Sequence, residues 1–229
     1  MCASPVSPSS KAGGKRLARL LLVDDHPIMR RGLAQLLQSH QGLEVCGEAG
    51  SAAEGMQAIE RLQPDLVIMD LTLPDQSGLE LLKDVRARFP SLRCLVLSMH
   101  HEDLYGERVL RAGARGYVMK EAAAENLVAA VLRVLSGGIY LSEAMSSRMI
   151  ERVAGQRRRG AGLEALTDRE IEVLELIGRG VATKNIAASL HISARTVEAH
   201  RSHLKEKLGL TDGPSLVRYA VQWVEQRQG

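Results

Sequence analysis

Acidic residues stand at the ends of two short apolar runs, where they could act together. Asp24 and Asp25 follow the run 17–23, and Asp70 follows the run 66–69. The second run is too short for a buried helix and is flanked by turn-forming residues, so it predicts a strand buried on both faces. The ligand crevice of an open parallel sheet lies beyond the carboxyl ends of its strands, where a carboxylate is positioned to react. Asp70 could instead only open a turn, as aspartate often does.

Two more strand ends carry polar side chains, a hydroxyl and an ammonium. Ser98 ends the apolar run 92–97, and Lys120 follows the run 116–119. Carboxylates gathered at one sheet edge repel one another unless a cation neutralises them, and oxygen ligands near the surface favour Mg²⁺. Acids, a metal and an ammonium together can stabilise a transferring phosphoryl group. The alternative is that Asp24 and Asp25 cap a helix and Lys120 is solvated at the sheet edge.

Short apolar runs alternate with amphipathic stretches over residues 17–135. Pro27 suits the first turn of a helix, with an apolar stripe formed by Ile28, Leu33, Leu36 and Leu37. The predicted strands are 17–23, 43–46, 66–69, 92–97 and 116–119, and predicted helices begin at 27, 51, 77, 102 and 122. This alternation predicts an α/β fold with a parallel sheet, helices on both faces and right-handed crossovers.

After residue 140 the alternation stops and the remaining pattern is helical. Helices are predicted over 142–153, from the capping box at Thr167 to Gly180, over 183–190, from Ser193 to Leu208, and over 215–226. A polar, glycine-containing stretch at 154–162 predicts a linker. We therefore divide the chain into a disordered tail (1–16), a first domain (17–140), a linker with a helix (141–162) and an all-α domain (163–229).

The composition is that of a soluble protein of the cytoplasm with no membrane partner. The 229 residues are 45% hydrophobic and 25% charged, and no apolar run is long enough to span a bilayer. Arg19 interrupts the apolar run near the N-terminus, which excludes a signal sequence. The cysteines, Cys2, Cys46 and Cys94, are odd in number and lack metal-ligand spacing, which suits a reducing compartment.

The second half of the chain carries features of a nucleic-acid-binding module. Residues 17–140 have a net charge of −3 and residues 141–229 a net charge of +3, a weak indication of nucleic acid as a partner of the second half. The short helix at 183–190, the tight turn at 191–192 and the longer helix that follows have helix-turn-helix spacing. An ordinary surface helix in a small bundle is the alternative.

A helical-wheel count orients the longer helix. At about 100° per residue, Val197, Leu204 and Leu208 fall on one stripe that must be buried. The opposite arc carries small and polar side chains that leave room for a base edge, and lysines nearby suit phosphate contacts. We expect DNA contacts from Thr183, Lys184, Arg195, Thr196, Glu198, Ala199, Ser202, His203, Lys205 and Lys207.

Residues 17–135 resemble the receiver domain of bacterial two-component response regulators, with its flavodoxin-like doubly wound (βα)₅ fold. The motifs LLVDDHP, DLVIMDLTLPDQSG, VLS and GYVMK carry the resemblance. It implies that Asp70 is the phospho-acceptor. It further implies that Asp25 and Asp70 bind Mg²⁺ directly, Asp24 through water, and Thr72 through its backbone carbonyl. Thr72 and His100 flank the site and are expected to tune the lifetime of the acyl phosphate, although His100 could simply be solvated.

The same resemblance assigns the residues that respond to the phosphoryl group. Ser98 corresponds to the switch hydroxyl, Tyr117 to the coupled aromatic residue and Lys120 to the cation that holds the phosphoryl oxygens. Tyr117 could instead be only a strand-edge aromatic. The sequence departs from the family pattern at Glu121, where many receivers have proline.

Residues 163–228 resemble the LuxR-type helix-turn-helix of the NarL/FixJ subfamily. The matching motifs are LTDREIEVLELIGRG, KNIAASLHISARTVEAH and LKEKLG. By position, Glu198, Ala199 and Ser202 occupy the face that the family uses on bases. Glu198 could accept from a cytosine amino group or only penalise wrong sequences. The last helix often forms the dimer contact in this family, but its apolar residues could equally pack within their own domain.

Together the resemblances imply a DNA-binding response regulator, not an enzyme beyond slow self-dephosphorylation. A sensor histidine kinase would phosphorylate Asp70 with Mg²⁺ bound, and the phosphorylated chain would dimerise on promoter DNA. The inactive state would hold the recognition helix against the receiver. One alternative is a regulator that binds DNA independently of phosphate and uses its receiver only to dimerise. Another is a Mg²⁺-dependent phosphohydrolase with Asp70 as nucleophile, for which the sequence offers no convincing pocket or acid–base residue.

Overall fold

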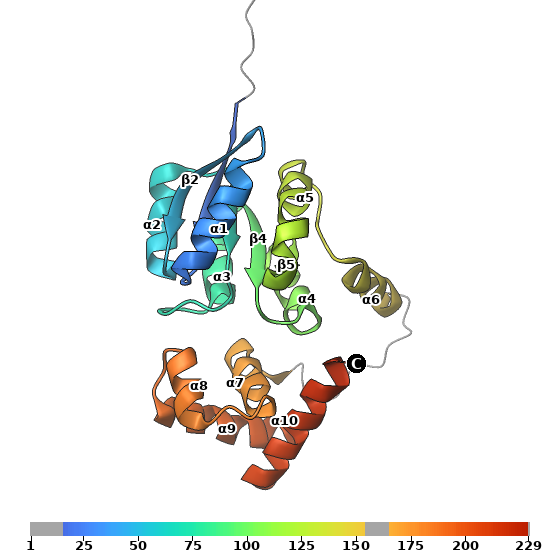
Figure 1. Ribbon diagram of the computed structural model, residues 1–229. Helices are drawn as coiled ribbons and strands as arrows, with labels where there is room; N and C mark the ends of the chain where they lie inside the picture. The colour runs from blue at the N-terminus through green and yellow to red at the C-terminus, as the bar shows by residue number, and fades with distance from the viewer. Residues whose placement is uncertain (1–15, 154–164, 229) are drawn as a thin grey trace, which may run out of the picture.

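A single parallel sheet forms the first domain. The computed structural model describes residues 16–153 and 165–228. The sheet contains five strands in the order β2-β1-β3-β4-β5, namely β1 (Ala18–Val23), β2 (Leu43–Ala49), β3 (Leu66–Met69), β4 (Arg93–Ser98) and β5 (Tyr117–Met119) (Figure 1). This is the flavodoxin-like doubly wound order, which confirms the predicted fold class. The strand order reverses beside β1 and β3, so the crevice of the sheet lies at their carboxyl ends.

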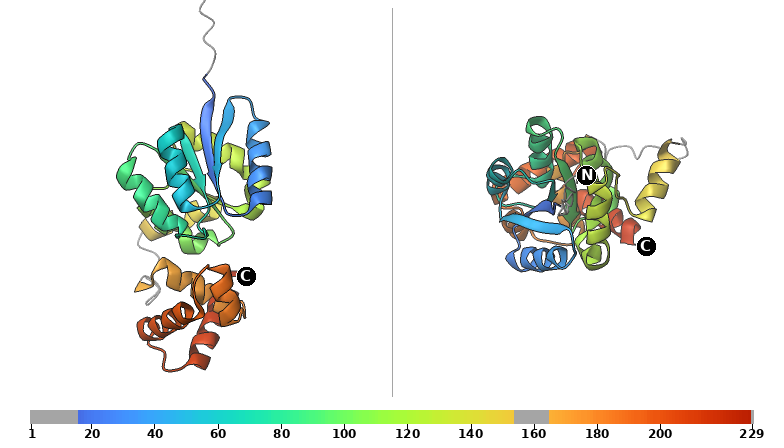
Figure 2. Two further views of the ribbon diagram at one scale, coloured as in Figure 1. Left: turned by 90° about the vertical axis from the view of Figure 1, so that its left-hand side faces the viewer. Right: turned by 90° about the horizontal axis from the view of Figure 1, so that it is seen from above.

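Helices cover both faces of the sheet. The apolar side chains of alternate strand residues pack with α1 (Pro27–Gln38) and α5 (Ala123–Leu135) on one face. On the other face they pack with α2 (Ala52–Leu62), α3 (Gly78–Arg88) and α4 (Glu102–Ala112) (Figure 2). All four residues of β3 are buried, as predicted for the central strand of a doubly covered sheet.

Two details of this domain differ from the sequence prediction. Ile28 does not belong to the apolar stripe of α1, because its side chain is 89% exposed while Leu33 and Leu37 are buried. At about 100° per residue, Ile28 lies opposite Leu37 on the helix. Strand β2 continues to Ala49, beyond the apolar run, because its backbone pairs with β1 as far as Val23.

Helix α6 (Glu143–Val153) follows the sheet domain and packs on α4. Met145 lies against Gly106, where a Cβ atom would stand only 2.4 Å from the Met145 methyl group. Arg148 pairs with Glu102 at 3.1 Å. The predicted tail, up to residue 15, and the predicted linker from residue 154 onward lie outside the described residues.

The second domain is helical, with α7 (Asp168–Gly178), α8 (Thr183–Ser189), α9 (Ala194–Leu208) and α10 (Gly213–Gln228). The predicted capping box is confirmed, because the Glu170 carboxylate accepts from the Thr167 amide at 2.7 Å and Thr167 Oγ1 accepts from the Glu170 amide at 3.3 Å. Gly209 ends α9 in the left-handed conformation, at φ 67°. Among the helices of the described ranges, none is long and apolar enough to cross a membrane.

Helices α7 and α10 cross closely at Gly178. A Cβ atom there would stand 2.4 Å from the Ala220 carbonyl oxygen, so only glycine fits. Leu216 and Ala220 are fully buried within the helical domain, while Val217 is 39% exposed. Leu216 and Ala220 therefore pack against their own domain, as the second interpretation of the last helix proposed.

Candidate functional site

Lys120 joins two carboxylates at the carboxyl edge of the sheet. Its ammonium lies 2.6 Å from Asp24 Oδ2 and 2.6 Å from Asp70 Oδ2. The three side chains follow β1, β3 and β5, and each is at most 4% exposed. The alternative of a solvated Lys120 is therefore wrong. His26, not either aspartate, is the N-cap residue of α1, and the structure assembles Asp24, Asp70 and Lys120 as the strand-end prediction required.

Backbone contacts fix the two carboxylates in place. The Asp70 amide donates to the Val23 carbonyl at 2.9 Å and the Asp24 amide to the Ala49 carbonyl at 3.1 Å, which extends the strand pairing into the site. The Leu71 amide donates to Asp70 Oδ1 at 2.6 Å. Asp70 therefore has little freedom, and its second oxygen points to the ammonium of Lys120.

Burial dominates the protonation of this pair. It raises the pKa of the Asp70 carboxyl group, and the charge of Lys120 only partly offsets this. Burial alone would lower the pKa of Lys120, but the carboxylates of Asp70 and Asp24 outweigh it and the pKa is raised. The ammonium is thus held charged beside a carboxylate that is poorly solvated, an arrangement suited to a nucleophile.

The acidic cluster also fits a divalent cation. Ligand atoms from Asp24, Asp25, His26 and Asp70 all lie within 4.8 Å of one another. Asp25 Oδ1 is buried and accepts no hydrogen bond of good geometry from the described residues, although His26 Nδ1 is 2.6 Å away. A carboxylate oxygen with no proper donor, in a set dominated by oxygen ligands, suits a hard cation such as Mg²⁺.

The predicted switch residues converge on His100. Ser98 is fully buried, and its Oγ accepts from the His100 amide at 3.3 Å. The buried Tyr117 donates its hydroxyl proton to the His100 carbonyl at 2.6 Å, so it is not a mere strand-edge aromatic. Thr72 Oγ1 lies 3.2 Å from His100 Nε2. The His100 side chain is 14% exposed, which makes the solvated alternative wrong.

The domains contact each other through α7, which was not predicted from the sequence. His100 Nδ1 lies 3.0 Å from Glu175 Oε2 on α7, and Arg108 on α4 pairs with Asp168 at 2.8 Å. Arg108 also donates to the Leu166 carbonyl at 2.9 Å. Figure 1 shows α7 and α8 on the side of the helical domain that faces the sheet domain.

We expected the inactive state to hold the recognition helix against the receiver, but the structure shows the reading face of α9 exposed. Arg195, Thr196, Glu198, Ala199 and Ser202 on α9 are all exposed. Helix α7 contacts the first domain instead, because its side chains Glu175 and Asp168 pair with His100 and Arg108. The turn before α9 also approaches the first domain, with His191 Nε2 3.9 Å from Asp25 Oδ2.

The candidate DNA-binding residues gather on α8 and α9. Of the stripe that the helical-wheel count predicted to be buried, Val197 and Leu204 are fully buried and Leu208 is half-buried, and the opposite arc faces solvent. Thr183 donates to Glu198 at 3.1 Å, which links the two helices of the motif. Lys184 is exposed and Lys205 half-buried. The structure thus presents a polar, small-residue surface on α9 with a flanking cation on α8.

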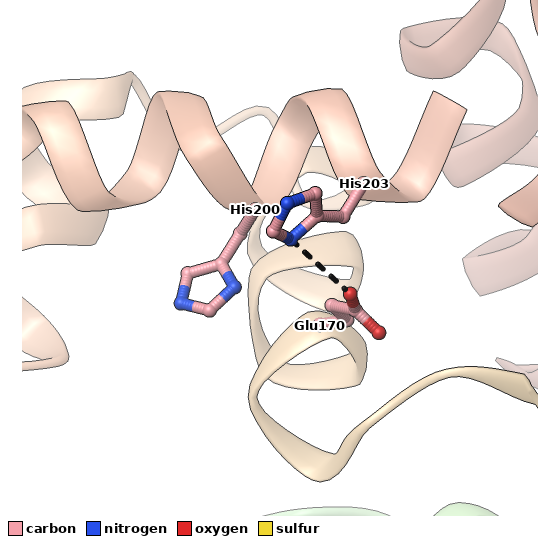
Figure 3. Close-up of side chains that lie close together, drawn as sticks. All are labelled: Glu170, His200 and His203. Carbon is pink, nitrogen blue, oxygen red and sulfur yellow. Dashed lines mark ion pairs between the residues drawn. The ribbon is translucent and has the colours of Figure 1, made fainter. Parts of the chain in front are cut away.

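Glu170, His200 and His203 form a second group of possible metal ligands, between α7 and α9 (Figure 3). Glu170 Oε2 is already paired with Lys207 at 2.7 Å and caps α7. Burial and the positive charges of Arg169 and Lys207 lower the pKa of His200. Because a cation is repelled by this surrounding charge, the group is explained as an ion pair that fastens α9 to α7. Lys207 has this structural partner in addition to its predicted role on DNA.

Two known families match different parts of the chain. Residues 20–132 match the family described as response regulator receiver domain, and residues 164–220 match bacterial regulatory proteins of the luxR family. Oxygen regulatory protein NreC of Staphylococcus carnosus is 35% identical over 210 residues, covering 89% of this chain and 97% of that protein. Transcriptional regulatory protein MctR of Rhizobium johnstonii is 36% identical over 203 residues, covering 89% and 92%.

Solved structures of response regulators share the architecture. The RcsB response regulator of Salmonella typhimurium matches with a TM-score of 0.65 and 26% identity, over 90% of this chain and 98% of that chain. RcsB of Salmonella enterica serovar Typhimurium bound to promoter rprA with the phosphomimetic BeF₃⁻ matches with a TM-score of 0.60 and 27% identity, over 90% and 99%. The likeness extends over both domains.

Proposed function

Since the chain belongs to the LuxR-type family of two-component response regulators, we propose that a sensor histidine kinase phosphorylates Asp70 and so controls its binding to promoter DNA. The main observation that supports this proposal is that Asp24 and Asp70 share one ammonium group, since Lys120 Nζ lies 2.6 Å from both carboxylates. In the transfer, the phosphorus–nitrogen bond of the phosphohistidine breaks and an oxygen of Asp70 forms the new bond. Lys120 then faces the phosphoryl oxygens and stabilises the added charge.

The cation site is proposed for Mg²⁺. Asp25 and Asp70 would hold the ion directly, Asp24 through water and Thr72 through its carbonyl. The ion would neutralise the carboxylates and the developing phosphoryl charge. The buried Asp25 Oδ1, which has no hydrogen bond of good geometry, supports this assignment. Ser98 and Tyr117 would respond to the phosphoryl group, and slow self-dephosphorylation would end the signal.

The DNA-binding part of the proposal assigns two kinds of contact. Phosphates would be contacted by Lys184, Lys205 and Lys207, which position the domain without specifying sequence. The bases would be read by Glu198, Ala199 and Ser202, and the same surface carries Thr183, Arg195, Thr196 and His203. The structure of two RcsB dimers bound to two parallel DNAs supports a homodimer on DNA. We place the activity in the cytoplasm, where kinase and promoter are both accessible.

The proposal is tested by phosphorylation of the purified chain with acetyl phosphate and Mg²⁺. Intact mass and peptide mapping are expected to locate one phosphoryl group at Asp70, and Asp70→Asn is expected to take up none. Asp84→Asn, an exposed aspartate on α3, is the matched control and retains phosphorylation. Genome-wide DNA occupancy of the wild type against Asp70→Asn then tests control. Equal occupancy would favour the regulator that binds DNA independently of phosphate.

A second prediction separates phosphate contacts from base contacts. Lys184→Ala is expected to weaken binding to all sequences alike and to reduce the slope of log affinity against log salt by about 1. Glu198→Ala is expected to keep the slope and change the preference at one base pair, by about 1–3 kcal/mol. Fluorescence anisotropy with duplexes selected from a random library by the wild-type protein measures both. An unchanged base preference in Glu198→Ala would remove Glu198 from the reading surface.

A further inference from the structure

All four polar atoms of His100 are engaged, and three of them contact residues of the phosphorylation site. Its amide donates to Ser98 Oγ, its carbonyl accepts from Tyr117, and its Nε2 lies 3.2 Å from Thr72 Oγ1. The fourth atom, Nδ1, contacts the other domain, where it lies 3.0 Å from Glu175 Oε2 on α7. His100 is therefore bonded at once to the elements around Asp70 and to helix α7.

The contact with Glu175 is directional. A carboxylate can only accept, so His100 Nδ1 carries the proton, and in the neutral ring Nε2 accepts from the Thr72 hydroxyl group. Tyr105 packs against the imidazole, with ring centroids 4.8 Å apart and ring planes tilted by 41°, and limits its rotation. The orientation of the ring is thus fixed by the first domain.

The buried carboxylate of Glu175 needs His100 as a hydrogen-bond donor. Its side chain is only 5% exposed, with Oε1 paired to Arg179 at 2.5 Å and Oε2 to His100. Loss of His100 would leave a buried carboxylate oxygen without its donor, which favours separation of α7 from the first domain so that water can solvate it.

We propose that His100 is the positioning residue through which the state of Asp70 controls the α7 contact. The inference rests on the proposed phosphorylation of Asp70 and names the route by which it acts. When Ser98 turns towards the phosphoryl group, its Oγ no longer accepts from the His100 amide. The His100 backbone and ring then shift, Nδ1 leaves Glu175, and α7 is released with the whole helical domain.

Release of α7 would change the position of the helical domain and not the exposure of α9, because the reading face of α9 is already exposed while α7 is bound to the first domain. A helical domain fixed to its own receiver cannot adjust to the spacing and orientation of a half-site. In a dimer, the released helical domain of each subunit can adjust to its own half-site. Arg108, in the second half of α4, also holds α7 through Asp168 but lies outside the group around Ser98. Arg108 therefore provides the matched control, because its ion pair holds α7 to the first domain but is not linked to the state of Asp70.

The test is hydrogen exchange of the full chain, followed in α7 peptides with and without BeF₃⁻ and Mg²⁺. In the wild type, exchange of α7 is expected to become about tenfold faster with BeF₃⁻, as the loss of one buried charged hydrogen bond would produce. His100→Ala and Glu175→Ala are expected to exchange fast in both conditions, with a ratio near one. Arg108→Ala is expected to exchange faster than the wild type without BeF₃⁻ and still to accelerate with it. Unchanged exchange in β1 and β3 identifies a folded receiver in each variant.

Two results with the variants overturn the proposal. One is that His100→Ala retains the wild-type acceleration, and the other is that Arg108→Ala loses it as completely as His100→Ala does. Phosphorylation by acetyl phosphate, measured by mass, separates the two levels of the hypothesis. If Asp70 takes up phosphate and α7 exchange does not change, this inference alone is wrong. If wild-type Asp70 takes up none, the proposed function fails and the inference with it.

Discussion

Replacing Lys120 with methionine is expected to destabilise the receiver by about 3–5 kcal/mol at neutral pH without divalent cations. The ammonium is the shared partner of Asp24 and Asp70, which are 4% and 3% exposed. Methionine has a similar length and no charge, so the two carboxylates would face each other in a poorly solvated site. Mg²⁺ is expected to restore much of the loss, because a ligand that binds only the folded state stabilises it by mass action.

The pH dependence of this variant has a definite sign. Burial already raises the pKa of Asp70, and removal of Lys120 takes away the largest opposing charge. A carboxyl group with a raised pKa binds its proton more tightly in the folded state than in the unfolded state. The destabilisation is therefore expected to shrink as the pH falls towards the ordinary aspartate pKa of about 4.

Urea denaturation at several pH values, with and without Mg²⁺, measures these effects. Lys83→Met is the matched control, because Lys83 is a lysine of the same domain whose side chain is 52% exposed, 3.5 Å from Glu80 and 3.7 Å from Asp168 of α7. It is expected to change the free energy of unfolding by less than about 1 kcal/mol, with no response to Mg²⁺ beyond that of the wild type. A Lys120→Met protein as stable as the control would show that the ammonium does not balance the carboxylates.

The sheet and its acidic edge could be predicted because their signals are local. The position of Asp70 follows from four apolar residues and the turn that ends them, and the same holds for Asp24 and Lys120. Parallel strands bring such ends to one edge whatever the intervening sequence. The helix-turn-helix could also be predicted from the sequence, because the spacing of the buried residues Val197 and Leu204 is enough to orient α9.

The contact of His100 with Glu175 could not be predicted in this way. The two residues are 75 positions apart and belong to different domains, whose relative placement leaves no periodic pattern. The signal that could have suggested it is the set of acids on α7. Glu172 and Glu175 are buried beside Ile171 and Leu174, which is costly unless a partner meets them. Arg169 and Arg179 of the same helical domain pair with Glu172 and Glu175, and it is the second oxygen of Glu175 that takes its partner from the first domain, so these acids do not identify His100.

Gly78→Ala is expected to damage both the stability of the receiver and the reactivity of Asp70. A Cβ atom at Gly78 would stand 1.9 Å from the Asp70 carbonyl oxygen and 2.7 Å from the Leu71 Cα. Both are backbone atoms, so relief requires the segment after β3 to move and to carry the Asp70 carboxylate with it. We expect a loss of about 1–3 kcal/mol in the free energy of unfolding. A displaced nucleophile is expected to lower the phosphorylation rate with acetyl phosphate by about a hundredfold.

Gly32 offers the matched substitution within the same domain. It lies in the interior of α1, and a Cβ atom there would meet nothing within 4 Å. Gly32→Ala is therefore expected to raise the free energy of unfolding by about 0.5–1 kcal/mol, since alanine is the better helix former. Because the two substitutions are chemically identical, opposite signs in urea denaturation would isolate the close approach at Asp70 as the cause. If Gly78→Ala were as stable and as readily phosphorylated as Gly32→Ala, the packing of α3 against the acceptor residue would not constrain the site.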